Sequence, residues 1–159
     1  MAFRVAQVRA NPYRDIQMTP TKACPIVLRR TQNRVEILAF EHPLSGFQIV
    51  KGTIEPGEPP ADAAVRELRE ESGITGVATA DLGLWESGFE QQIWSLHLCE
   101  PTQPQPLPDT WEHHTADDDG HVFRFFWHPL GEAPSEQWQS LFRDALSVIG
   151  ERLARMGKS

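Results

Sequence analysis

The first half of the chain alternates between short apolar runs and polar turns in a way that predicts β-strands. Residues 23–29 and 34–42 are apolar and rich in β-branched side chains, and the polar turn between them predicts a β-hairpin. A short third strand is expected over 47–50, just before Lys51. The same criteria place three further strands over 82–89, 91–99 and 121–129.

Two segments have the composition and periodicity of α-helices. Residues 60–72 are strong helix formers, Pro60 suits a first turn that needs no N–H group, and Gly73 suits the C-terminal end. From Ser135 to Met156 apolar residues recur every three or four positions, which predicts a second helix. Strands and helices in this order predict an α/β fold with a mixed sheet.

Two stretches fit neither pattern. Residues 1–20 are polar and interrupted by prolines, so we expect either an extra edge strand or a loose arm. Residues 100–109 hold four prolines, which excludes a helix or a central strand and predicts a stiff surface loop. The length of 159 residues fits a single domain that spans residues 1–159.

The charge of the chain limits its partners. Fifteen Lys and Arg residues against 22 Asp and Glu residues give a net charge of −7, and no basic stretch offsets it. Nucleic acid is therefore not an expected partner, and an acidic protein that handles phosphates needs a metal ion. No run of 18 apolar residues exists, so a membrane span is not expected either.

Few residues bear on the compartment. Residues 1–12 do not resemble a signal peptide, and Cys24 and Cys99 form no CxxC pair. We therefore expect a cytoplasmic protein with buried thiols, and a single disulfide is the alternative. A homodimer is compatible with the sequence.

The helix predicted over 60–72 carries an unusual acidic face. At about 100° per residue, its apolar side chains fall on one stripe. A separate stripe carries three carboxylates, those of Glu67, Glu70 and Glu71. Like charges at this spacing, near a helix C-terminus, destabilise the helix, and a divalent cation such as Mg²⁺ or Mn²⁺ would remove the conflict. The alternative is a solvated charged face with Asp62–Arg66 and Arg66–Glu70 pairs.

The residues around this helix match a known family signature. From Gly52 to Ile74 the chain has glycine, five residues, glutamate, seven residues and then Arg-Glu-Leu-Arg-Glu-Glu-Ser-Gly-Ile. This segment resembles the signature box of the Nudix hydrolases, and every specified position is filled; we call it the Nudix box. The resemblance covers about residues 20–157 and implies an α/β/α sandwich around a mixed β-sheet, with the box as a loop–helix–loop and a C-terminal helix.

The resemblance also implies a metal site. Glu70 and Glu71 would be metal ligands, and Glu67 would be a third ligand or the general base. The carbonyl oxygen of Gly52 would complete the coordination. The metal implied is Mg²⁺, for which Mn²⁺ would substitute.

Other polar residues would support these ligands. By this resemblance, Arg66 would hold a glutamate in position by ion pairing, and Glu58 would either contact the metal indirectly or bind an additional metal ion. An acid outside the box often supplies the base or another ligand, and Glu112 is our first candidate, followed by Glu90. The aspartates at 117–119 are alternatives, unless they only form a polar turn.

The implied reaction is hydrolysis of a diphosphate bond in a nucleoside diphosphate linked to a group X. The products would be a nucleoside monophosphate and phosphorylated X. Metal ions would neutralise the phosphates and acidify a bound water, and a carboxylate would take the proton. The expected partner is therefore a small nucleotide-type substrate. The alternative is a non-catalytic Nudix-fold sensor that binds a nucleotide derivative, which the complete set of box glutamates disfavours.

Substrate choice depends on residues outside the Nudix box. Phe89 stands where ADP-ribose pyrophosphatases usually carry a proline, and the tyrosine typical of dinucleoside-polyphosphate hydrolases is missing. Core positions are expected for Trp94, Trp127 and Trp138. The candidates for contact with the substrate are Phe47, Lys51, Trp85, Phe89 and Trp111.

Overall fold

The computed structural model describes residues 18–116 and 120–157, and within these ranges the chain forms two β-sheets and two α-helices. Residues 1–17 of the N-terminal segment, for which we expected either an edge strand or a loose arm, lie outside the described residues. None of the helices within the two ranges is long and apolar enough to cross a membrane. The elements in chain order are β1 (Lys22–Ile26), β2 (Leu28–Thr31), β3 (Arg34–His42), β4 (Gly46–Gln48), β5 (Gly52–Thr53), α2 (Pro60–Ser72), β6 (Gly76–Glu86), β7 (Ile93–Pro101), β8 (Trp111–His114), β9 (Val122–Pro129) and α3 (Ser140–Arg155).

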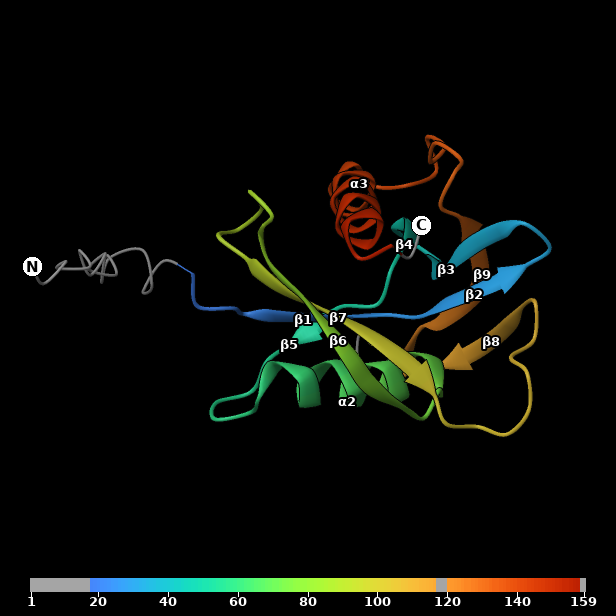
Figure 1. Cartoon of the computed structure of the whole chain (residues 1–159). Helices are drawn as coiled ribbons and strands as arrows, with labels where there is room; N and C mark the ends of the chain where they lie inside the picture. Colours follow the sequence, from blue (N-terminus) through green and yellow to red (C-terminus); the bar gives the residue numbers. More distant parts are fainter. Residues whose placement is uncertain (1–17, 117–119, 158–159) are drawn as a thin grey trace, which may run out of the picture.

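The two sheets differ in strand direction. The first sheet has the order β5-β1-β7-β6 and is mixed, because β1 runs parallel to β7 while the other pairs are antiparallel. The second sheet is antiparallel, with the order β2-β3-β9-β8 and with β4 paired to β3. The helices α2 and α3 lie on opposite sides of the strands (Figure 1). The expected α/β/α sandwich, with its mixed sheet, box helix and C-terminal helix, is confirmed.

The pattern of residues 23–29 predicted a single strand of a hairpin, and the structure differs from this prediction. The segment divides at Val27 into β1, which pairs with β7, and β2, which forms the hairpin with β3. Val27 is buried, and its carbonyl oxygen accepts a hydrogen bond from the backbone N–H of Leu38 at 2.9 Å. The division therefore leaves this carbonyl paired, and one continuous run joins the two sheets.

Several other strands and the C-terminal helix also differ from the prediction. β6 begins at Gly76, because its first three residues pair with the end of β7, and hydrophobic periodicity does not reveal this long-range pairing. Residues 111–114 form β8 against β9, a strand that was not among those predicted from the sequence. The C-terminal helix begins at Ser140, because residues before it form a turn in which the N–H of Trp138 donates to the carbonyl oxygen of Ser135.

Local sequence signals set both ends of α2. Pro59 and Pro60 occupy the N-cap and the first helical position, where a missing N–H group costs nothing. At the other end Gly73 has a φ of 81°, a left-handed conformation that favours glycine, and its N–H donates to the carbonyl oxygen of Arg69 at 2.9 Å. The bounds of α2 are those predicted from the sequence.

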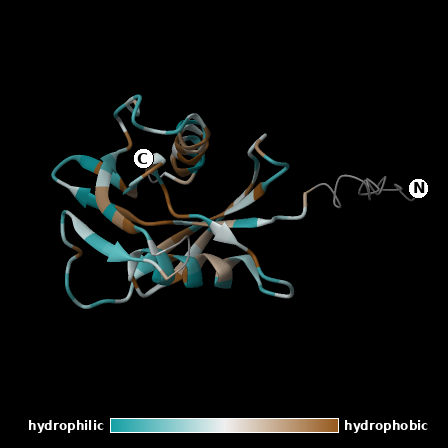
Figure 2. Ribbon diagram, turned by 180° about the vertical axis from the view of Figure 1, so that it is seen from behind, coloured by the Kyte–Doolittle hydropathy of each residue, from teal (hydrophilic) through white to brown (hydrophobic). Residues whose placement is uncertain are grey.

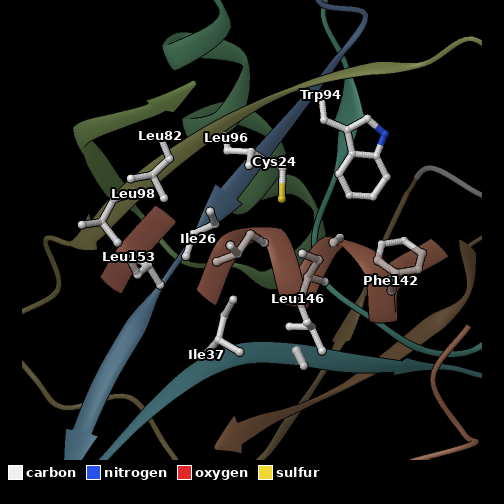
Figure 3. Packing of buried hydrophobic residues seen from close by; sticks show 14 of the residues in the cluster. Cys24, Ile26, Ile37, Leu82, Trp94, Leu96, Leu98, Phe142, Leu146 and Leu153 are labelled. Atoms are coloured by element: carbon white, nitrogen blue, oxygen red, sulfur yellow. The ribbon is translucent and has the colours of Figure 1, made fainter. Parts of the chain in front are cut away.

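Two hydrophobic clusters fill the space between sheets and helices. The first packs α3 against strands of both sheets, and Figure 3 shows its side chains converging on the helix. The second packs α2 against the other side of the strands. In Figure 2 hydrophobic residues gather on the strands between the two helices. The three tryptophans expected in the core, Trp94, Trp127 and Trp138, are buried.

The two cysteines are buried free thiols, one in each cluster. Burial raises the pKa of both thiols, that of Cys99 to about 11. Thiols with pKa values this high are protonated near neutral pH and are weak nucleophiles. Cys24 and Cys99 are thus the buried thiols that the sequence led us to expect, and no disulfide joins them.

Candidate active site

The guanidinium group of Arg66 gathers three carboxylates of the Nudix box. Its Nε and Nη2 atoms donate to the two carboxylate oxygens of Glu58 at 2.8 and 2.9 Å. Its Nη1 atom donates to Glu67 at 2.9 Å and to Glu70 at 3.1 Å. A further bond from Nη2 reaches the carbonyl oxygen of Thr53 at 2.9 Å. One side chain on α2 therefore ties β5 and the following loop to the acidic face of the helix.

These ion pairs replace the solvated face that the sequence left open as an alternative. The hydrogen bond from Arg66 holds the pKa of Glu58 at about 2, well below its usual value. The same bond raises the pKa of Arg66. Of the two pairs in that alternative, Arg66–Glu70 is formed, while Asp62 makes no ion pair with Arg66 among the described residues.

Glu67 is the buried member of the acidic face. Glu67 is only 8% exposed, although its side chain carries a carboxylate. A Cβ atom placed on Gly52 would overlap this carboxylate, so the close approach of β5 to α2 requires glycine there. Gly52 pairs with Ala23 of β1, which fixes its position at the edge of the mixed sheet. Gly52 and the carboxylate of Glu67 are thus neighbours. The family resemblance assigns the carbonyl oxygen of Gly52 and this carboxylate to the same metal.

Glu70 and Glu71 extend the acidic face to the end of α2. Both are half-buried. The carbonyl oxygen of Glu70 lies 3.0 Å from the Nε2 atom of His113, so β8 holds this end of the helix. Glu71 attracts the ammonium group of Lys51 electrostatically. The three glutamates therefore lie between the loop before α2 and the strand β8.

The ligands available here suit a hard divalent cation. This face offers carboxylate and carbonyl oxygens, which Mg²⁺ and Mn²⁺ prefer. Glu67 and Glu70 are turned toward Arg66, and in residues 18–116 and 120–157 no three acidic, histidine or cysteine side chains converge on one point. The donor chemistry fits a metal ion, and binding it would require the glutamates to rotate about their side-chain bonds.

Three of the residues proposed from the sequence line one hollow on the second sheet. This hollow has a volume of about 520 Å³ and is lined by Glu41, Phe47, Thr110, Trp111, Glu112, Arg124, Phe125 and Phe126. The indole N–H of Trp111 donates to the carbonyl oxygen of Ser72 at 3.0 Å, so the hollow adjoins the C-terminal end of α2. The indole ring stacks on Phe125 with 5.1 Å between ring centres.

Glu112 is exposed at the rim of this hollow. Its carboxylate pairs with Arg124 at 3.2 Å, and both side chains are more than half exposed. The carboxylate lies on β8, beside the His113 that contacts the end of the box helix. The alternative acids at 117–119 lie outside the described residues.

The remaining candidates for substrate contact lie elsewhere. Lys51 is half-buried beside the Nudix box, with its ammonium 5.2 Å from the centre of the Trp94 ring, and burial lowers its pKa. Trp85 packs edge-on against Trp94 at 4.9 Å, at the margin of the α3 cluster. Phe89 is 46% exposed in the turn between β6 and β7, next to Glu90. The structure thus does not bring Trp85 and Phe89 to the hollow that holds Phe47 and Trp111.

Two polar residues of this region escaped the sequence analysis. Arg124 interrupts the apolar strand β9, and that interruption was the one available sign of its position in the hollow. Gln92 accepts a hydrogen bond from Lys51 at 3.2 Å across a separation of 41 residues. Nothing in the sequence around Gln92 indicates this contact.

The fold and the complete Nudix box define the class of Nudix-type pyrophosphohydrolases. Residues 19–146 match the NUDIX domain, and the chain belongs to this family. No curated protein gives a significant match to the sequence.

Solved structures with the same fold include several hydrolases. An ADP-ribose pyrophosphatase from Streptococcus suis has 13% sequence identity and a TM-score of 0.62, and the match covers 87% of this chain and 92% of that one. A UDP-X diphosphatase has 13% identity and a TM-score of 0.62, covering 89% of this chain and 65% of its own. The Nudix hydrolase RenU from M. smegmatis has 17% identity and a TM-score of 0.57, covering 86% and 88%. At these identities the likeness establishes the fold alone.

Proposed function

We propose that this Nudix-type pyrophosphohydrolase cleaves a diphosphate bond in a nucleoside diphosphate linked to a group X, with Mg²⁺ as the metal and Mn²⁺ as a substitute. The products would be a nucleoside monophosphate and phosphorylated X. The observation that carries the proposal is the set of ion pairs through which Arg66 gathers Glu58, Glu67 and Glu70, with the buried Glu67 carboxylate set against Gly52.

Each box residue has a task in this proposal. Glu67, Glu70, Glu71 and the carbonyl oxygen of Gly52 would hold the metal, and Glu58 would contact it less directly. The metal would supply charge neutralisation of the phosphates and a lowered pKa of the attacking water. Arg66 would orient the glutamates through its guanidinium group. A carboxylate, that of Glu67 or of Glu112, would accept the proton of the attacking water.

The substrate would extend from these glutamates to the surrounding side chains. Lys51 directly precedes Gly52 of the box, carries a positive charge on the α3 side and would contact a phosphoryl oxygen. The hollow of Phe47 and Trp111 adjoins the end of α2 and offers aromatic surface for a nucleobase. Two proteins with the same fold are an ADP-ribose pyrophosphatase and a UDP-X diphosphatase, which supports a nucleoside diphosphate derivative as the substrate class.

A substrate panel tests the proposal directly. Purified protein is incubated with Mg²⁺ and with nucleotide sugars, ADP-ribose, dinucleoside polyphosphates and nucleoside triphosphates, and the products are separated by chromatography. We expect a nucleoside monophosphate from at least one nucleoside diphosphate derivative, abolition of activity by EDTA, and recovery with Mg²⁺ or Mn²⁺. Activity that survives chelation would refute the metal role. An inactive protein that binds one of these compounds would instead be a sensor.

A further inference from the structure

Lys51 has an unusual environment for a lysine. Its ammonium nitrogen lies 5.2 Å from the ring centre of Trp94 and 5.9 Å from that of Phe142, and it donates a hydrogen bond to the Oε1 atom of Gln92 at 3.2 Å. The residue is half-buried. Across residues 18–116 and 120–157 no carboxylate lies within ion-pair distance of this ammonium, and the attraction of Glu71 and Glu90 acts from farther away.

A half-buried ammonium that has no counter-ion in the part of the chain that the structure describes is energetically costly. Two aromatic faces and one amide oxygen compensate it in part. An ammonium has three N–H donors, and Gln92 accepts one of them. The environment therefore favours an anion that brings further acceptors to Lys51.

The position of Lys51 indicates which anion this is. Lys51 precedes Gly52, and β5 is an edge strand of the mixed sheet. Gly52 faces Glu67 on the α2 side, whereas Lys51 contacts Trp94 and Phe142 on the α3 side. Figure 3 shows Trp94 and Phe142 together at one end of the α3 cluster. A diphosphate that is held at the glutamates and extends past this strand edge to the α3 side would meet Lys51 there.

Gln92 is the residue that fixes the ammonium. Its Oε1 atom also accepts a hydrogen bond from the indole N–H of Trp94 at 3.3 Å, so the amide cannot turn away without losing a second partner. Its backbone is equally constrained. The N–H of Gln92 donates to Phe89 at 2.9 Å, and its carbonyl oxygen accepts from the hydroxyl and the N–H of Ser87 at 2.8 and 3.1 Å.

We propose that Gln92 is a positioning residue, which holds the Lys51 ammonium toward a phosphoryl oxygen of the substrate at the point where the diphosphate passes the edge of β5. This inference rests on the proposed function, because it assigns a diphosphate to the Nudix box. Within the turn between β6 and β7, it adds the amide of Gln92 alone to the groups that position the substrate.

A double-mutant cycle tests the proposal. Lys51→Met, Gln92→Leu and the double variant are compared with the wild type by steady-state kinetics on the substrate identified by the panel. Since a charge-assisted hydrogen bond is removed, we expect Lys51→Met to lower kcat/KM by roughly 10-fold or more, mainly through KM. Gln92→Leu should lower it by about 3–10-fold, and the double variant should match Lys51→Met, because Gln92 acts through Lys51.

Two further variants separate positioning from a structural role. Gln92→Glu keeps the volume of the side chain and gives Lys51 a carboxylate partner, so we expect it to raise KM at least as much as Gln92→Leu while the melting temperature is kept. Gln91→Leu alters the neighbouring exposed residue of the same turn and should leave KM and kcat unchanged. Losses in the double variant that multiply, or a KM unchanged in Gln92→Glu, would overturn the proposal.

Binding without turnover separates this inference from the proposed function. Methylenediphosphonate, which is not hydrolysed, is titrated into each variant by calorimetry in Mg²⁺ buffer. We expect its Kd to rise roughly 10-fold or more in Lys51→Met. Equal Kd values in the wild type and Lys51→Met would overturn the inference even if the enzyme is active. A Lys51-dependent Kd in an inactive protein would leave the inference standing and refute the proposed function.

Discussion

The carboxylate of Glu67 lies so close to the Cα atom of Gly52 that a methyl group on Gly52 would occupy its place. We therefore expect Gly52→Ala to push the carboxylate aside and to lower turnover by roughly 10-fold or more, because the carboxylate would leave the acidic face. The end of a glutamate side chain moves easily, so the melting temperature should change little. Steady-state kinetics and thermal unfolding of the same preparation check this.

Gly131→Ala is the matched control for this substitution. A Cβ atom at Gly131 meets no atom within 4 Å. We expect wild-type turnover from this control. A fully active Gly52→Ala variant would show that Glu67 can leave its observed position without harm to the reaction.

Glu71→Gln tests the proposed metal site at its end nearest to Lys51. The substitution keeps the volume and removes the charge, so we expect turnover to fall by about two orders of magnitude or more, while the circular dichroism spectrum stays that of the wild type. Glu100→Gln, at an exposed position on β7, serves as the control and should be fully active. Near-normal turnover in Glu71→Gln would remove this residue from the metal site.

Glu36, which lies outside the Nudix box, allows a test of how the stability of the fold depends on pH. This residue is 4% exposed and accepts hydrogen bonds from Arg29 at 3.0 Å and from Thr31 at 2.9 Å. Burial acts to raise the pKa of Glu36, but these hydrogen bonds outweigh it, and the pKa lies below the usual 4.5. The ionised carboxylate therefore stabilises the fold above a pH of about 4.5, and this stabilisation is lost as the pH falls through the lowered pKa.

We expect Glu36→Gln to lower the free energy of unfolding at pH 7 by about 1–3 kcal/mol. The difference from the wild type should shrink toward zero as the pH is lowered below 4.5. Urea unfolding at several pH values measures it. Glu132→Gln, which removes a more exposed partner of Arg34, should cost less than about 1 kcal/mol. A loss that is the same at pH 3 and pH 7 would contradict the assignment.

Glu112→Gln tests the candidate base outside the box. Because the pair with Arg124 is exposed, we expect no change in stability. If Glu112 accepts the proton, kcat should fall by roughly 100-fold and its pH dependence should change. Glu41→Gln removes a different carboxylate from the same hollow, and its kcat serves as the control. An unchanged kcat in Glu112→Gln would direct attention to the aspartates at 117–119.

Local sequence signals predicted the bounds of α2, but they predicted the contacts of its side chains only in part. The prolines at the start and Gly73 at the end act within one helical turn, so the bounds were correct. The acidic face was also visible, because helical periodicity is local. That Glu67 is buried, and that Arg66 reaches back to Glu58, depends on how the loop before the helix folds. The sequence therefore favoured a cluster of carboxylates but left the solvated face open.

Long-range pairing explains what the sequence did not reveal. The division at Val27 depends on two different partners, β7 and β3, which lie far apart in the chain. β8 exists because four residues with little apolar alternation pair with β9. The bond between Gln92 and Lys51 likewise joins the turn before β7 to the residue before β5, which only the fold brings together. Hydrophobic periodicity carries no information on such partners.

The passage of the chain through Val27 also bears on how the enzyme can respond to its substrate. One uninterrupted backbone run supplies β1 to the sheet of the Nudix box and β2 to the sheet that carries the hollow. Hinge closure of one sheet over the other would have to bend this run next to Val27, which is buried and hydrogen-bonded to Leu38 of β3. We therefore expect a preformed site, in which adaptation is confined to turns and side chains.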